Sequence, residues 1–400
     1  MSSLSILSFG RLAPCGRVIG ATLLAASLWL GGVSPVGAQT ALPPPDIAAR
    51  SWFLIDVTTN TVLYSQMPDE RVEPASLTKL MTAYLVFSAL RDNTIKLDTR
   101  PPVSQKAYKA IGSRMFVDPR VPATVDELLH GLIIQSGNDA AIILAEAVAG
   151  SEEQFVDRMN AEARRLGMKN THFVNASGLP APDHYSSARD LALLSTHLIK
   201  DFPGYYKLYS EKEYTFNGVR QFNRNRLLFI DPTVDGVKTG HTDAAGYCLI
   251  ASARREQSGT GFSRRMLSVL LGAGSESSRA TESQKLLNYG FQNFEVLSLY
   301  KKGEPVGRHP VWKGKKATVA AGFAENVLIT APRSQVANIK GEIERTEPLV
   351  APIQAGQRIG TLRIKLGETI IAERPLQAQE TVETAGWFKR TWDTIRLWIK

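Results

Sequence analysis

The chain has 400 residues, of which 44% are hydrophobic and 21% are charged, and its formal net charge is +9. This composition is typical of a globular protein long enough for two domains with their own cores, and it excludes a disordered chain. The basic residues are spread along the sequence without a dense run, and no nucleic-acid-binding motif occurs. We therefore expect an anionic membrane or an acidic polymer, and not nucleic acid, as the partner of this charge.

Residues 1–38 have the pattern of a secretory signal peptide. Arg11 and Arg17 precede an uncharged, mostly apolar stretch at 18–34, and small residues lead to a cleavage position after Ala38. An uncleaved membrane anchor is the alternative, although the stretch is short for a spanning helix. The sequence thus predicts an exported protein at the outer, periplasmic face of the cytoplasmic membrane.

The chain has two cysteines, and they predict no intrachain disulfide. Cys15 falls inside the signal segment, so the mature chain keeps Cys248 alone. Because Cys248 lies in a strand-like stretch, we expect a buried structural thiol and not a reactive one.

The segment after the signal begins with strand patterns and continues with helical ones. Residues 51–65 contain two β-rich runs around Thr59 and Asn60, which predicts a hairpin. Thr124, with Glu127 three residues later, forms a capping box that marks the start of a helix. Helical patterns occur at 76–90, 124–134, 139–150 and 153–166.

Strand patterns return at the end of this first domain, which we place at residues 39–297. They are followed by a closing helix at 277–294. Strands at both ends of the domain, with helices between them, predict an α+β fold with one antiparallel sheet and a helical cluster on one side. The returning strands are expected at 235–242, 247–256 and 265–273.

Residues 298–384 have a different pattern. LRIKL at 362–366 alternates apolar and basic residues, and other short β-rich runs are separated by turn signals. This pattern predicts a small all-β domain. We find no catalytic constellation in it.

The last segment, 385–400, predicts an amphipathic helix. It is too short and too charged to span a bilayer, but tryptophans on one side and cations on the other are typical of a helix lying in the membrane interface. A helix packed on its own protein is the alternative. The apolar side comprises Trp387, Phe388, Trp392, Ile395, Trp398 and Ile399, and the polar side comprises Lys389, Asp393, Arg396 and Lys400.

Ser76 and Lys79 form an S-x-x-K pair at the start of a predicted helix, where residues three apart share a face. A serine hydroxyl needs a neighbouring base to act as a nucleophile, and a lysine can be that base only when it is neutral. The pattern is weak alone, because one such match is expected by chance in a chain of this length. A second match, Ser298 with Lys301, lies at the expected domain boundary, and we interpret it as that chance match.

Two further motifs accompany the first pair. Ser136-Gly137-Asn138 is the single S-x-N of the chain, and Lys238-Thr239-Gly240 is its single K-T-G. Together with Ser76 and Lys79 they can build an acyl-transfer site. In it Ser76 attacks, Lys79 takes the proton, and Ser136 and Lys238 relay protons and keep Lys79 neutral. Thr239 can bond a substrate carboxylate, and Gly240 leaves room for substrate backbone along the strand.

With these motifs in this order, the chain resembles the serine D-alanyl-D-alanine carboxypeptidases, the low-molecular-mass penicillin-binding proteins of peptidase family S11. ASLTK, LIIQSGNDA, YSSARDLALL, FNRNRLL, VDGVKTGHTDAAGY and ESQKLLNYGF are similar to that family. The resemblance runs from about residue 48 to the C-terminus. It implies a penicillin-recognising fold with a five-stranded antiparallel sheet and a helical cluster.

The resemblance also implies roles for single residues. Ser76 would carry the acyl group, Lys79 would be the base and Ser136 a proton relay. The backbone N–H groups of Ser76 and His241 would form the oxyanion hole. Asp190 matches a position near the site, although it can equally cap its helix. Substrate binding is assigned to Asn138, Arg224, Lys238, Thr239, Gly240, His241 and Arg279, with surface charge as the alternative for the two arginines.

The expected activity is removal of the terminal D-alanine from peptidoglycan stem pentapeptides, without metal or organic cofactor. β-Lactams would acylate Ser76. A β-lactamase or an endopeptidase of the same superfamily, or a non-catalytic wall-binding protein, are the alternatives. No H-x-x-x-H pair and no G-x-S-x-G occur, so zincin and nucleophile-elbow sites are not expected, and no E-x-x-L-N follows Ser136 as in many β-lactamases.

Overall fold

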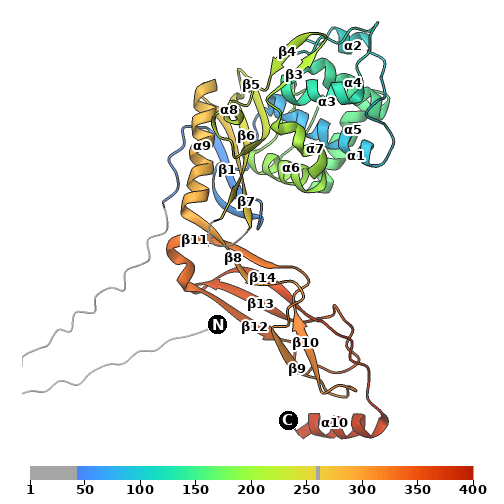
Figure 1. Cartoon of the computed structure of the whole chain (residues 1–400), viewed down its shortest axis with the longest axis vertical. Helices are drawn as coiled ribbons and strands as arrows, with labels where there is room; N and C mark the ends of the chain where they lie inside the picture. The colour runs from blue at the N-terminus through green and yellow to red at the C-terminus, as the bar shows by residue number, and fades with distance from the viewer. Residues whose placement is uncertain (1–42, 258–261, 400) are drawn as a thin grey trace, which may run out of the picture. The chain divides into compact units, whose positions relative to one another are not determined.

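The computed structural model describes residues 43–257 and 262–399, so the signal segment and Cys15 lie outside the described residues. An antiparallel sheet with helices on both faces forms the larger domain, and a second, all-β domain follows it in the chain (Figure 1). The larger domain and the β domain have separate hydrophobic cores. This organisation agrees with the predicted α+β domain followed by a small β domain.

The sheet of the larger domain has five antiparallel strands in the order β2-β1-β7-β6-β5. It is built from both ends of the domain, which confirms the prediction, and β1 and β2 form the expected hairpin. Strand β1 is buried along its whole length because its alternate side chains enter cores on the two faces of the sheet. The strands are β1 Ser51–Asp56, β2 Thr61–Gln66, β5 Val234–Thr242, β6 Gly246–Glu256 and β7 Ser263–Ala273.

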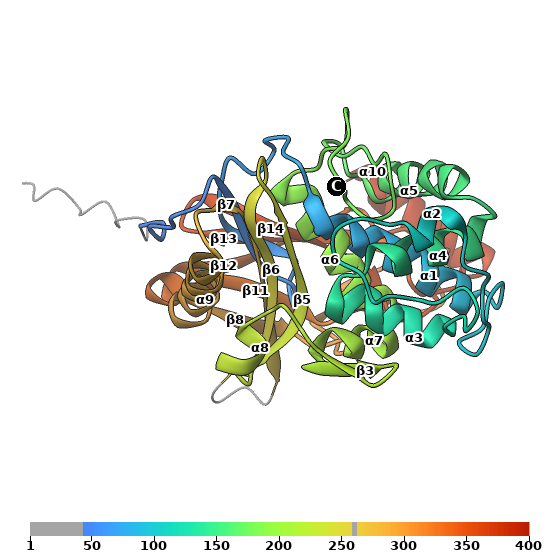
Figure 2. The ribbon, with the colours of Figure 1, turned by 90° about the horizontal axis from the view of Figure 1, so that it is seen from above.

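Alternate residues of β6 face opposite sides of this sheet. Cys248 and Ile250 belong to the core beneath the helical cluster, whereas Leu249 and Ala251 belong to the core beneath α9. The two helical layers are visible on either side of the sheet in Figure 2. Cys248 is completely buried, as the sequence predicts for a structural thiol.

The helices of the cluster begin near the predicted positions. The capping box of Thr124 and Glu127 is present at the start of α3, and α4 begins at Asn138. A short hairpin, β3 Glu213–Phe216 with β4 Val219–Phe222, lies beyond the cluster in the chain. The helices are α1 Lys79–Arg91, α2 Gln105–Tyr108, α3 Val125–His130, α4 Asn138–Ala149, α5 Glu152–Leu166, α6 Ala188–Asp201, α7 Pro203–Tyr206, α8 Leu227–Ile230 and α9 Glu276–Asn293.

The second domain is all-β, as predicted. Its main sheet has the order β12-β13-β14-β10-β9, and β11 pairs with β8. The domain boundary expected between 297 and 298 falls inside β8, which begins directly after α9. The strands are β8 Phe294–Tyr300, β9 Gly307–Pro310, β10 Thr318–Gly322, β11 Val327–Pro332, β12 Ile339–Arg345, β13 Arg358–Leu366 and β14 Thr369–Ala378.

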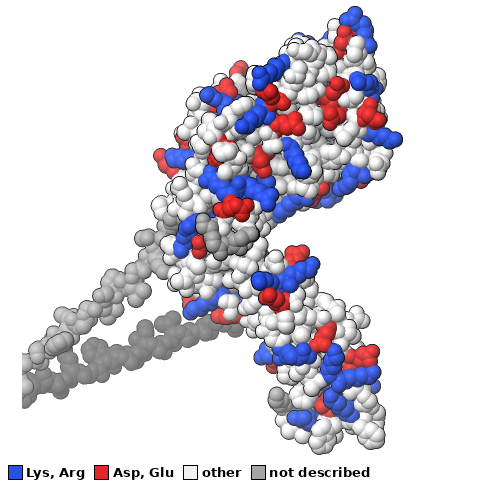
Figure 3. Space-filling view, in the orientation of Figure 1, with Lys and Arg blue, Asp and Glu red and all other residues white. Residues whose placement is uncertain are grey.

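The chain ends in the helix α10, Trp387–Ile399. Within the described part of the chain, no helix is both long and apolar enough to cross a membrane. On the face of the molecule drawn in Figure 3, lysine and arginine side chains are mixed with aspartate and glutamate and do not gather in one basic patch.

Candidate active site

Ser76 lies in a 3₁₀ turn, η1 Ala75–Thr78, directly before α1. The residue before it, Ala75, has φ +48°, a left-handed conformation that is strained for a side chain other than glycine. Gly178 lies against this turn: a Cβ at that position would be 1.8 Å from the carbonyl oxygen of Ala75. The strained turn is thus held in place by a neighbouring loop, and it presents Ser76 half-buried at the cavity wall.

Lys79 is the first residue of α1, and its side chain is buried with 1% of its area exposed. Its Nζ lies 3.2 Å from Ser76 Oγ. The same nitrogen donates hydrogen bonds to Asn138 Oδ1 at 2.7 Å and to the carbonyl oxygen of Ser177 at 2.5 Å. The amine is therefore fixed within reach of the serine proton by two further acceptors.

The surroundings of Lys79 disfavour its charged form. Burial, and then the positive charge of Arg224, lower the pKa of Lys79 to about 7, against a smaller opposing effect of Asp139. Burial and the nearby cations also hold the pKa of Lys238 well below its usual range. The two lysines repel each other when both are charged, because Lys79 contributes to the lowered pKa of Lys238, and Arg224 is a further cation that disfavours charged Lys79.

The S-x-N motif joins two helices and lines the same cavity as Ser76. A π-helical turn, η2 Gly131–Gln135, ends at Ser136, whose φ of +66° is left-handed. Ser136 Oγ is buried and makes no hydrogen bond to any described residue. Asn138 begins α4, and its Nδ2 donates to the carbonyl oxygen of Ile111 at 2.7 Å. Ser136 lines the cavity, and its expected role as a proton relay stays a prediction.

The K-T-G motif lies on β5, the edge strand of the sheet. Lys238 and Thr239 are buried, whereas His241 is exposed, with its ring centroid 4.1 Å from that of Tyr247. A Cβ on Gly240 would lie 3.2 Å from the Pro74 carbonyl oxygen and would contact the nucleophile turn. The missing side chain therefore leaves room for the chain before Ser76. Gly240 also lines the cavity, so its expected place beside substrate backbone stays a prediction.

Two arginines add positive charge to the lining of the site. Arg224 donates to Ser113 Oγ at 2.8 Å, and Arg279 donates to the carbonyl oxygen of Gly240 at 3.4 Å. Both line one polar cavity of about 210 Å³ together with Ser76, Ser136, Asn138, Thr239, Gly240 and His241. Lys79 and Lys238 are buried and do not line the cavity themselves, but other residues of all three motifs do. The cavity therefore brings the three motifs together around Ser76.

Sequence reasoning missed the loop that holds Lys79. Ser177 acts through its carbonyl oxygen, for which no side-chain pattern exists. Asp190, in contrast, accepts hydrogen bonds from Asn170 N and Thr171 Oγ1 away from the cavity lining, and Ser187 caps α6 in its place. Within residues 43–257 and 262–399, no group of three or more His, Cys, Asp or Glu could hold a metal ion.

A cavity serine with a buried lysine beside it, at the edge of a five-stranded antiparallel sheet, defines the class of serine acyl-transfer enzymes with the penicillin-recognising fold. Comparison with known proteins agrees. The family model of D-alanyl-D-alanine carboxypeptidases, peptidase S11, matches residues 38–274, and the model of the C-terminal domain of penicillin-binding protein 5 matches 294–384.

Individual relatives match almost end to end. D-alanyl-D-alanine carboxypeptidase DacC of Escherichia coli is 43% identical over 93% of this chain and 94% of its own, and DacA of that organism is 40% identical over 90% of each. Penicillin-binding protein 5 of Haemophilus influenzae superposes with a TM-score of 0.80 at 38% identity over 86% of this chain and 100% of its own. The chain belongs to the peptidase S11 family, and it is a serine D-alanyl-D-alanine carboxypeptidase.

Proposed function

We propose that this enzyme removes the terminal D-alanine from stem pentapeptides of peptidoglycan through an acyl ester on Ser76, at the outer face of the cytoplasmic membrane. The observation that carries the catalytic proposal is the 3.2 Å contact between Lys79 Nζ and Ser76 Oγ. It matters because a lysine with a pKa of about 7 is substantially neutral at physiological pH and can accept the serine proton.

In acylation, Lys79 takes the proton of Ser76 while Oγ forms a bond to the carbonyl carbon of the penultimate D-alanine. The carbonyl oxygen becomes an oxyanion, for which the backbone N–H groups of Ser76 and His241 are the donors expected from the family resemblance. When the intermediate collapses, the C–N bond breaks and the leaving amine takes a proton through Ser136. The products are free D-alanine and an ester on Ser76.

In deacylation, a water molecule attacks the ester carbonyl carbon and gives up a proton to the lysine side of the site. The bond to Ser76 Oγ breaks, and this oxygen recovers a proton, so the enzyme returns to its starting state. Arg224, Arg279 and Thr239 line the same wall of the cavity and can hold the terminal carboxylate of the substrate. A carboxypeptidase needs such a cationic wall because its substrate ends in a carboxylate.

β-Lactams should acylate Ser76, because their strained amide resembles the bond that the enzyme cleaves. The relative penicillin-binding protein D2 of Listeria monocytogenes, which is 32% identical over 63% of this chain and 100% of its own with a TM-score of 0.56, was solved in an ampicillin-bound form. This complex supports the proposal that β-lactams occupy the cavity beside Ser76.

Attachment to the membrane is assigned to α10. Its polar side docks on the β domain: Asp393 accepts from Lys313 N at 2.7 Å, and Lys389 Nζ donates to the carbonyl oxygen of Gly314 at 2.7 Å. The six apolar side chains expected on one side are between 50% and 91% exposed. A helix whose polar side is occupied and whose apolar side is free is suited to lie in a membrane interface.

The test compares release of D-alanine and labelling by fluorescent penicillin in three variants. Ser76→Ala should lose both activities while it stays folded. Lys79→Arg should lose both, because arginine stays protonated at any working pH. Ser298→Ala, in the chance motif, should behave like the wild type. Labelling of Ser76→Ala at the wild-type rate would refute the assigned nucleophile.

A second comparison decides between the related activities. Pentapeptide hydrolysis well above cleavage of a crosslinked dimer would support the carboxypeptidase, and the reverse would support the endopeptidase. Rapid loss of the penicillin label would indicate a β-lactamase, and no label would indicate a non-catalytic protein.

A further inference from the structure

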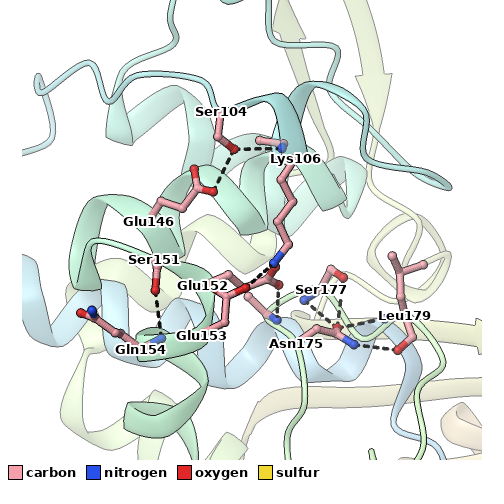
Figure 4. Close-up of polar contacts among 12 residues, drawn as sticks. Ser104, Lys106, Glu146, Ser151, Glu152, Glu153, Gln154, Asn175, Ser177 and Leu179 are labelled. Carbon is pink, nitrogen blue, oxygen red and sulfur yellow. Dashed lines mark hydrogen bonds and ion pairs between the residues drawn. The ribbon is translucent and has the colours of Figure 1, made fainter.

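A buried carboxylate outside the catalytic cavity contacts the loop that holds Lys79. Glu152, at the start of α5, is 5% exposed. Its Oε1 accepts a hydrogen bond from the N–H of Ala176 at 2.9 Å, and its Oε2 lies 2.8 Å from Lys106 Nζ (Figure 4). A charge is tolerated in a buried position when it is paired and hydrogen-bonded, and both conditions are met here.

The contacted loop supports the catalytic amine directly. The carbonyl oxygen of Ser177 accepts from Lys79 Nζ at 2.5 Å, and that of Ala176 accepts from Thr82 Oγ1, also on α1, at 2.6 Å. Asn175 Oδ1 accepts the backbone N–H groups that follow it and fixes the bend of the loop from inside. Glu152 fixes the same loop from outside, through α5.

Lys106 connects Glu152 to the chain segment that holds Asn138, the other acceptor of Lys79. It belongs to α2, and five residues later the carbonyl oxygen of Ile111 accepts from Asn138 Nδ2 at 2.7 Å. Asn138 Oδ1 in turn accepts from Lys79 Nζ at 2.7 Å. The ion pair between Lys106 and Glu152 therefore joins the segment that holds Asn138 to the loop that contains Ser177. Asn138 and Ser177 supply the two acceptors for Lys79 Nζ.

A second cavity lies beside this ion pair. It has a volume of about 310 Å³, is lined by Lys106, Glu152 and Asn175, and shares Ser177 and Leu179 with the catalytic cavity. Beside this cavity, Glu152 contacts the loop through its hydrogen bond to the N–H of Ala176.

We propose that Glu152, fixed by its ion pair with Lys106, is a positioning residue that holds the Ala176–Ser177 backbone and thereby keeps Lys79 Nζ against Ser76. This inference rests on the proposed role of Lys79 as the base. It assigns to Glu152 no contact with the substrate.

The test uses the mature chain and measures the rate of acylation by fluorescent penicillin between pH 5 and pH 9. Glu152→Ala leaves the Ala176 N–H without its acceptor, and we expect a loss of about tenfold to a hundredfold at pH 7, as for other small misplacements of catalytic groups. The acid limb of the rate profile should move to higher pH, because a loosened loop admits water to Lys79 and reverses the burial that lowers its pKa.

Two variants separate positioning from general damage. Glu152→Gln keeps an acceptor for Ala176, so it should restore the rate to within a few-fold of the wild type and return the acid limb to its place. Glu153→Gln is the matched control, because Glu153 pairs with the same Lys106 at 2.8 Å but is exposed, and it should leave rate and profile unchanged.

The proposal is overturned if Glu152→Ala acylates like the wild type. It is also overturned if that variant loses thermal stability while its acid limb stays at the wild-type pH, since a merely structural role gives that result. Ser76→Ala and Lys79→Arg are measured in parallel. Labelling of these two would refute the proposed function itself, whereas their inactivity beside an unaffected Glu152→Ala would refute the role of Glu152 alone.

Discussion

At the scale of single residues, the chemistry depends on a lysine whose charge is disfavoured. Burial is the main cause of the low pKa of Lys79, and the positive charge of Arg224 adds to it. A base works best when its pKa is near the working pH, so this shift makes the amine an efficient proton acceptor. Arg224 therefore affects the electrostatics of the base, in addition to its proposed contact with the substrate carboxylate.

The electrostatic role of Arg224 can be measured through the pH profile of acylation. The neutral amine is the active form, so the rate rises with pH through the pKa of Lys79 and levels off above it. Arg224→Gln removes a repelling cation, so the pKa should rise and the acid limb should move to higher pH. Because Arg224 is exposed and its charge is screened by solvent, we expect a shift of only about half a pH unit.

The measurement is penicillin acylation at several pH values, with Arg226→Gln as the control. Arg226 is exposed, stands two residues away and does not line the cavity. An acid limb that moves equally in both variants, or in neither, would show that Arg224 does not tune the base.

The three motifs could be recognised from sequence because each is a short run of side chains. The support of Lys79 could not, since it involves a backbone carbonyl, that of Ser177, brought by a loop almost a hundred residues later in the chain. The contact of Gly240 with the nucleophile turn could not be predicted either, because the direction of its missing side chain depends on how η1 packs on β5.

At the scale of elements, a short 3₁₀ turn and a loop set the position of the nucleophile. The η1 turn is strained at Ala75, and the loop residue Gly178 fits directly against it. Strain of this kind persists only where surrounding structure fixes it. The close contact between the loop and the turn therefore holds Ser76 in its position.

Gly178→Ala should damage this contact severely. Gly178 has φ +85°, and the new Cβ would lie 1.8 Å from the Ala75 carbonyl oxygen and 2.9 Å from Thr78 Oγ1. We expect a destabilisation of about 3 kcal/mol or more, from the backbone conformation and the clash together, and loss of penicillin labelling in the protein that remains folded.

The matched control is Gly167→Ala. Gly167 has the same φ of +85° at the end of α5, but nothing lies within 4 Å of its would-be Cβ. This variant should be destabilised by about 1 kcal/mol, because alanine adopts the left-handed backbone conformation less readily than glycine, and its penicillin labelling should stay intact. Equal melting temperatures and equal labelling of the two variants would contradict the proposed packing of the loop on the turn.

Most regular elements follow from local patterns in the sequence. The β1–β2 hairpin, the capping box of Thr124 and the three returning strands were predicted from turn residues, capping and β-rich runs. The 3₁₀ turn at Ser76 and the π-helical turn before Ser136 were not, because neither has a sequence signature and both are imposed by tertiary packing.

At the scale of the whole molecule, the contacts of the C-terminal helix are compatible with both alternatives that the sequence left open. The helix packs on its own β domain, but it does so with its polar side, where Arg396 lies over the ring of Trp312 at 5.6 Å. Two of its cations, Lys389 and Arg396, contact the protein, so fewer charges than the sequence suggested are available to attract anionic lipid.

Membrane binding should therefore depend on apolar burial more than on charge. Trp387, Trp392 and Trp398 are 69%, 63% and 91% exposed, and each large side chain can contribute up to about 2 kcal/mol when buried. Replacing all three with serine should abolish sedimentation of the protein with vesicles that contain anionic lipid, while D-alanine release in solution stays unchanged.

Arg390→Gln serves as the control for charge alone and should bind the vesicles nearly as the wild type does. The triple tryptophan variant keeps the contacts of Asp393 and Lys389, so it avoids the exposed docking site that a deletion of residues 387–400 would leave. Unchanged sedimentation of the triple variant would contradict attachment through α10.

The most direct test of the central claim is to locate the acyl group by mass spectrometry. The mature protein is treated with benzylpenicillin, digested and mapped, and the same preparation is assayed for D-alanine release from a pentapeptide. The predicted result is one penicilloyl adduct, on the peptide that carries Ser76, with both adduct and D-alanine release absent in Ser76→Ala. An adduct on another residue, or D-alanine release that survives Ser76→Ala, would contradict the assignment of Ser76 as the nucleophile.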